Sequence, residues 1–146
     1  MIIIDLIQSI KKLKVPPELK KEGMICKKPV SYNDEMPRVF RQSRINLNIT
    51  SKTIEHGVPL RVFDILACGG FCLTNYQTGI AELFTDGQDL VMYGSIEDAV
   101  DKVKYYLSHE EERKKIADTG YRTLKEQHTF DHRAQEILQI AGLIRE

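Results

Sequence analysis

Residues 57–75, GVPLRVFDILACGGFCLTN, restrict the fold more than any other part of the chain. An apolar segment begins after Pro59 and stops at the double glycine Gly69-Gly70, and a second short apolar segment follows at once. Proline suits the first turn of a helix, and glycine commonly ends one in a left-handed conformation. The pattern therefore predicts a helix from Pro59 to about Cys68, followed directly by a short buried strand.

The same alternation of strands and helices continues on both sides of this segment. It is typical of a parallel sheet in a layered α/β domain. At 146 residues, the chain has the length of one such domain, so we expect a single domain over residues 1–146. The expected strands are 24–30, 45–50, 71–75 and 89–93, the expected helices are 34–43 (capped by Asn33 or Asp34) and 59–68, and a helical turn is expected at 79–84.

Both ends of the chain have helical patterns. The first residues, MIIIDLIQSIKKLK, place apolar side chains at helical spacing with lysines opposite, which predicts an amphipathic helix that stops at Pro16-Pro17. After residue 94 the pattern is helical throughout. Ser95 is the expected N-cap of the first of these helices, Ser108 and Glu111 are in capping-box positions for the second, and the third runs from Thr129 to Gly142.

Composition excludes several classes of protein. Lysine and arginine number 21, as do aspartate and glutamate, so no net charge attracts nucleic acid or an anionic membrane. No apolar run approaches the roughly 20 residues of a membrane span, and the first residues lack the basic region and small-residue cleavage site expected of a targeting segment. Three cysteines form no paired framework, which favours a reduced, cytoplasmic protein.

The expected helix after Pro59 carries a candidate binding site. Ligands of open parallel sheets bind beyond the carboxyl ends of the strands, where helix N-termini attract phosphate. Gly57 would allow close approach, Arg61 could contact a diphosphate, and Asp64, one turn further on, could accept hydrogen bonds from ribose hydroxyls. This arrangement describes a nucleoside diphosphate. The alternative is an ordinary i,i+3 surface ion pair between Arg61 and Asp64.

The histidines and cysteines do not suggest a metal site. His128 and His132 are four residues apart, but Thr129 is expected to cap a helix between them, and no further ligand type repeats nearby. We expect surface or capping roles for the histidines. Cys68 and Cys72 fit neither a zinc nor a redox spacing and are expected to be buried as small apolar residues.

Four motifs, in order, carry a family resemblance: RVFDILACGGF, LTNYQTGIAELFTDGQDLVMY, YYLSHEEERKKIADTG and HTFDHRAQEIL. Together they resemble the C-terminal half of CgeB-like glycosyltransferases, members of the group-1-like set with the GT-B fold, over residues 30–140. The resemblance implies a Rossmann-like donor domain that binds a nucleotide-diphosphate sugar, with Asp64 at the position that holds the donor ribose. It implies that the loop after the 71–75 strand faces the diphosphate and the sugar, so Asn75, Tyr76, Gln77 and Thr78 are further donor-binding candidates; an ordinary polar turn is the alternative.

The chain departs from this family in two ways. Related enzymes have a glutamate eight residues before the acidic position, where this chain has His56 preceded by Glu55, which makes these two residues possible contacts to the sugar. A complete enzyme also has an N-terminal acceptor domain, so we expect this chain to need that missing domain or a second copy as a partner. No metal or other cofactor is expected, because the helix dipole and Arg61 would offset the charge of the leaving diphosphate. The alternative function is a non-catalytic α/β module for nucleotide binding or protein interaction.

Overall fold

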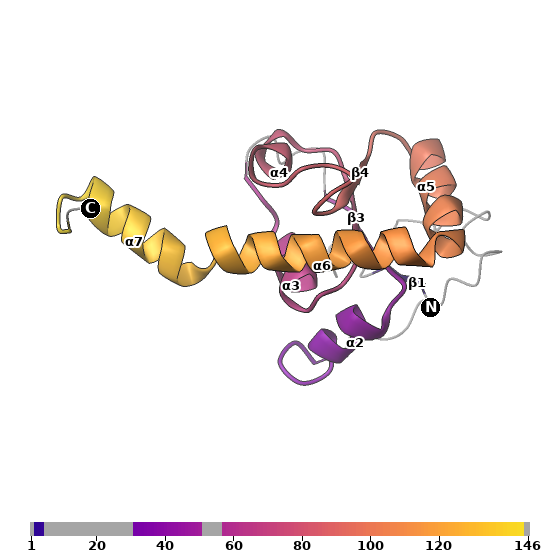
Figure 1. The fold of residues 1–146 in the computed structure, drawn as a ribbon, viewed down its shortest axis with the longest axis horizontal. Helices are drawn as coiled ribbons and strands as arrows, with labels where there is room; N and C mark the ends of the chain where they lie inside the picture. Colours follow the sequence, from indigo (N-terminus) through magenta and orange to yellow (C-terminus); the bar gives the residue numbers. More distant parts are fainter. Residues whose placement is uncertain (1, 5–30, 51–56, 145–146) are drawn as a thin grey trace.

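A four-stranded parallel sheet is the centre of the computed structural model, which describes residues 2–4, 31–50 and 57–144 (Figure 1). The strands lie side by side in chain order, β1-β2-β3-β4. Leu47 of β2 pairs with Ile4 of β1 and Leu73 of β3, and Leu73 pairs in turn with Val91 of β4. The strand bounds are Ile2–Ile4 (β1), Ile45–Asn48 (β2), Cys72–Asn75 (β3) and Val91–Tyr93 (β4).

Helices cover both faces of the sheet. Because side chains alternate along a strand, Leu73 packs on one face while Cys72 packs on the other. The Leu73 face is covered by α5 (Ile96–Ser108) and the first half of α6 (Glu110–Gln127). The Cys72 face is covered by α2 (Met36–Gln42), α3 (Leu60–Ala67) and α4 (Thr78–Leu83). This layered arrangement confirms the predicted parallel α/β fold with a helical C-terminal region.

Helix α6 connects the two apolar layers. Ile116 and Ala117 pack with α5 and the sheet, whereas Leu124 packs with α3 and α4. Between them, Gly120 lies directly against the Asp89 carbonyl. The hydroxyl of Thr123 donates to the buried Asp89 carboxylate at 2.7 Å, and the Thr85 amide donates to its other oxygen at 2.8 Å. Figure 1 shows α6 crossing the body of the molecule and α7 (Phe130–Ile140) extending beyond it.

Local chemistry explains several helix boundaries. Gly69, with φ of 68°, follows α3 in the left-handed conformation that the sequence predicts. Ser95 caps α5 by accepting from the Asp98 amide, and Thr129 caps α7 in a capping box with His132. These three predictions are confirmed. Pro59 is the N-cap of α3 rather than a residue within its first turn.

Other predictions at helix ends and at the N-terminus are wrong. Residues Ile2–Ile4 form a strand rather than part of a helix, because three consecutive β-branched side chains pair with Ile45–Leu47. Ser108 belongs to the end of α5, where its hydroxyl donates to the Tyr105 carbonyl, and His109 is the N-cap of α6. Helix α2 begins after Glu35 with no side-chain cap. The predicted strand 24–30 and the rest of the predicted N-terminal helix lie outside the described residues.

Replacing Gly120 with alanine should disrupt the contact between α6 and the turn before β4. A Cβ atom there would overlap the Asp89 carbonyl oxygen and lie 2.9 Å from Leu66 Cδ2. Alanine is intrinsically favoured over glycine in a helix by about 1 kcal/mol. We nevertheless expect Gly120→Ala to lower the free energy of unfolding by about 2 kcal/mol or more.

Urea denaturation followed by circular dichroism measures this effect. Gly94→Ala is the matched control, because a Cβ atom at Gly94 meets no atom within 4 Å. We expect that variant to stay within about 0.5 kcal/mol of the wild type. Equal stabilities for the two variants would contradict the close packing of α6.

Candidate functional site

The candidate site lies at the carboxyl ends of β2 and β3. Gly57, in the segment that leads into α3, has φ of 111°, a conformation that favours glycine. Its carbonyl oxygen would lie 3.1 Å from a Cβ atom at Gly79, so the backbone before α3 packs closely on the first turn of α4. The starts of these two helices therefore lie close together.

A polar network joins the carboxyl ends of β2, β3 and β4. The Asn75 side-chain oxygen accepts a hydrogen bond from the Thr50 amide at 2.7 Å. The Asn48 side-chain amide donates to the hydroxyls of Thr74 at 3.0 Å and Thr50 at 3.2 Å, and the Tyr93 hydroxyl donates to the Asn48 carbonyl. Asn75, predicted as a donor-binding residue, thus holds the backbone of Thr50, just after β2.

The remaining candidates after β3 differ in exposure. Tyr76 is 60% exposed and Thr78 is exposed as well, so both side chains can meet a ligand. Gln77 is buried and is the N-cap of α4. Glu55 and His56, the predicted sugar-side residues, lie outside the described residues.

Arg61 lies in the first turn of α3 and faces α2. Its guanidinium carbon is 5.8 Å from the centroid of the Phe40 ring, which is within reach of a cation–π contact. Burial lowers the pKa of Arg61, and the nearby Asp64 carboxylate opposes that shift. No salt bridge joins Arg61 to Asp64 among the described residues, so the alternative of a simple surface ion pair is not what the structure shows.

Asp64 contacts a residue that the sequence analysis did not identify. The Tyr32 hydroxyl donates to Asp64 Oδ1 at 2.9 Å, across 32 residues of chain. This hydrogen bond to a carboxylate raises the pKa of Tyr32. Beside it is a small pocket of about 120 Å³, lined by Tyr32, Met36, Pro37, Phe40, Asp64, Ala67 and Cys68. A half-buried carboxylate at an apolar pocket, already accepting one hydroxyl, is suited to bind further hydroxyl groups.

The histidines and cysteines that the structure describes cap helices, stack on rings or pack in the core. His132 forms the α7 capping box, as the sequence analysis predicts, and the His109 ring stacks on Tyr105 at 3.9 Å between centroids. Cys72 is fully buried, which raises its pKa to about 12, and burial also raises the pKa of the half-buried Cys68. In the part of the chain that the structure describes, no three His, Cys, Asp or Glu side chains are grouped to hold a metal ion.

Comparison with solved structures defines the class of fold. The chain is similar to the crystal structure, at 1.35 Å, of the C-terminal domain of a group 1 family glycosyl transferase from Francisella tularensis. The TM-score is 0.63 at 18% identity, over 77% of this chain and 60% of that chain. The fold is therefore that of the C-terminal half of a GT-B glycosyltransferase, and this chain spans less than two thirds of the solved chain's length.

The family model described as "Glycosyl transferase-like" matches residues 16–139. The chain belongs to this family. No curated protein matches the sequence. Among the described residues, no helix has the length and apolar character needed to cross a membrane.

The contact between Tyr32 and Asp64 can be tested by titration. Asp64→Asn removes the negative charge that favours the protonated phenol, so we expect the pKa of Tyr32 to fall toward its ordinary value of about 10. The titration is followed by tyrosinate absorbance. Subtracting the curve of the corresponding Tyr32→Phe variant, for both the wild type and Asp64→Asn, gives the titration of Tyr32 alone.

Tyr105 supplies an internal control for this titration. Its hydroxyl donates to Glu112 at 2.9 Å, and this bond raises the pKa of Tyr105 in the same way. Only Glu112→Gln, not Asp64→Asn, should change the titration of Tyr105. A Tyr32 titration unaffected by Asp64→Asn would contradict the observed contact.

Proposed function

We propose that this chain binds the nucleotide-diphosphate-sugar donor of a glycosyltransferase of the CgeB-like kind. The observation that carries this proposal is the placement of Arg61 and Asp64 on one side of α3, facing α2. Asp64 there accepts a hydroxyl hydrogen bond rather than forming an ion pair with Arg61. A cation and a carboxylate held one turn apart, each with its own contact, can bind two different parts of one ligand.

The diphosphate would lie at the start of α3. This helix has no side-chain cap, so its first amide groups can donate to phosphate oxygens, and the helix dipole adds partial positive charge. A Cβ atom at Gly57 would meet nothing within 4 Å, which indicates open space beside this backbone. Arg61 adds a charged donor and would stabilise the leaving diphosphate during transfer.

The ribose would lie at Asp64, one turn further along α3. A carboxylate offers about four acceptor positions, and Tyr32 occupies one of them on Oδ1. The remaining positions can accept the two ribose hydroxyls. Tyr76, after β3, and Thr78, the first residue of α4, are exposed and can reach the ligand. Glu55 and His56 stay predictions for the sugar side.

Transfer of a sugar requires an acceptor-binding partner. Donor and acceptor of a GT-B enzyme bind between two domains, and this chain has the fold of one of them. We infer that an acceptor domain, or a second copy of this chain, completes the active site, and that the protein acts in the cytoplasm without a required metal.

Two substitutions should impair binding of different parts of the ligand. Arg61→Ala removes a charge-assisted contact worth roughly 1.5–3 kcal/mol, so a nucleoside diphosphate should bind about 10- to 100-fold more weakly. Binding of the bare nucleoside should barely change. Asp64→Asn halves the acceptor capacity and should weaken both ligands alike, with a smaller effect on a 2′-deoxy ligand. Calorimetric titration measures all these affinities.

Arg122→Ala is the matched control, because it removes an exposed arginine from α6. Circular dichroism should show unchanged folding for all three variants. If Arg61→Ala and Asp64→Asn both keep wild-type affinity for every nucleotide tested, the proposed donor site is wrong.

Nucleotide binding should also persist in the presence of a chelator. The proposed site neutralises the diphosphate with helix amides and Arg61, and no pair of carboxylates is among the residues assigned to the phosphates. We expect EDTA to change the calorimetric dissociation constant by less than about twofold, or roughly 0.4 kcal/mol. Loss of binding with EDTA and its return on adding magnesium would show that a metal ion bridges the ligand.

A further inference from the structure

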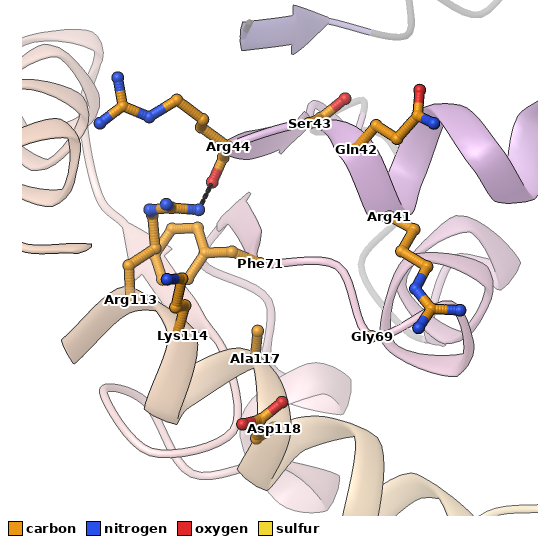
Figure 2. Close-up of a pocket in the computed structure, with 10 residues that line it drawn as sticks. All are labelled: Arg41, Gln42, Ser43, Arg44, Gly69, Phe71, Arg113, Lys114, Ala117 and Asp118. Carbon is orange, nitrogen blue, oxygen red and sulfur yellow. Dashed lines mark hydrogen bonds between the residues drawn. The ribbon is translucent and has the colours of Figure 1, made fainter. Parts of the chain in front are cut away.

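A second cavity lies at the opposite end of the sheet from the proposed donor site. Its volume is about 320 Å³. Ser43 and Arg44 line it just before β2 begins, and Gly69 and Phe71 line it just before β3 begins, so it is at the amino ends of these strands. The lining residues, shown in Figure 2, are Arg41, Gln42, Ser43, Arg44, Gly69, Phe71, Arg113, Lys114, Ala117 and Asp118.

Positive charge dominates the lining of this cavity. Arg41, Arg44, Arg113 and Lys114 line it with a single carboxylate, Asp118. Lys114 is paired with Glu110 at 2.8 Å. The three arginines form no salt bridge within the residues that the structure describes. In a protein with no net charge, these three arginines gather here without a salt bridge in the described part of the chain, and Glu110 is the carboxylate whose charge acts on Arg44 and Arg113.

Arg113 is the least satisfied of these cations. Its side chain extends from α6 and is buried, with only 8% exposed. One terminal nitrogen, Nη1, donates to the Arg44 carbonyl at 2.6 Å, but the buried Nε has no hydrogen-bond partner among the described residues. Burial and the nearby Arg44 charge both lower the pKa of Arg113. A buried guanidinium beside a second positive charge costs stability, and a bound anion would offset that charge.

The shape of the cavity is suited to a compact ligand. Figure 2 shows Arg41 from α2 and Arg113 from α6 on opposite sides, with Gly69 and Ala117 between them. The small side chain of Ala117 and the left-handed glycine at Gly69 leave this space open. Phe71 is buried beneath and presents no exposed ring on which a base could stack. A second charged group on the ligand would allow it to contact both walls.

We propose that this cavity binds a small phosphate-rich anion, a diphosphate being the smallest that carries a charged group for each wall. Guanidinium groups match phosphate oxygens through a planar fork of two parallel hydrogen bonds, and Arg113 provides the first such cation at this cavity. Arg41 contributes the second cation, and Asp118 opposes binding. This site is separate from the donor site, because it uses the other end of the strands and none of the same side chains.

Inorganic pyrophosphate is the probe for this site in the full 146-residue chain. Amide shifts in a two-dimensional NMR titration should move at Gly69, Ala117 and Asp118. Arg41→Gln should weaken pyrophosphate binding about tenfold, which corresponds to about 1.4 kcal/mol. Asp118→Asn removes the opposing carboxylate and should strengthen binding about threefold. Arg113→Lys keeps the charge but loses the fork, and should weaken binding at least as much as Arg41→Gln.

Matched variants distinguish this proposal from the donor site. Arg122→Gln, on the same helix as Arg113, and Arg61→Ala should both leave the shifts at Gly69 and Ala117 unchanged. Arg41 and Asp118 are exposed, so their variants test the site even if Arg113→Lys fails to fold. Any of three results would overturn the proposal. The first is a pyrophosphate shift confined to residues around Gly57, and the second is an Arg122→Gln variant that weakens binding as much as Arg41→Gln. The third result is the absence of any shift at roughly 10 mM pyrophosphate, a concentration above the dissociation constant expected of a specific site.

Discussion

The contact of α6 with the turn before β4 is the constraint on which the rest of the structure depends. Gly120 allows the helix backbone to lie against the Asp89 carbonyl, and the Asp89 side chain binds Thr123 and Thr85. Because α6 contributes side chains to both apolar layers, this contact positions the helix against both. A buried carboxylate is costly unless its oxygens are satisfied, and here each oxygen accepts a short hydrogen bond.

Local signals in the sequence predict much of the fold. The left-handed glycine after α3 and the N-caps Ser95 and Thr129 follow from interactions within four residues, which a sequence displays directly. Strand β1 could not be predicted in this way. Its isoleucines form a strand because they pair with Ile45–Leu47, which lie more than forty residues further along the chain. The helical spacing of the same side chains is misleading without the partner strand.

The same difference between local and long-range signals applies to the candidate sites. Arg61 and Asp64 were identifiable because they are one turn apart on a single helix. Tyr32 was not, since its contact with Asp64 joins segments 32 residues apart. The arginine-lined cavity unites α2, the start of β2 and α6, and no spacing in the sequence relates these residues. Asn48 and Thr74 were visible as polar residues in apolar strands, but only the register of β2 with β3 explains their pairing.

Helix α7, unlike α5 and α6, contributes no buried residue to the domain. It has 11 residues, and its Arg133 donates to the His128 ring and to the Gln127 carbonyl. His128 in turn bonds the Leu83 carbonyl. Isolated helices of fewer than about 12–15 residues are marginally stable in water, since tertiary packing normally supplies most of their stability. The amides of α7 are therefore expected to exchange with solvent through local fraying, at rates set by the helix itself. Those of α6 exchange only when the whole core opens.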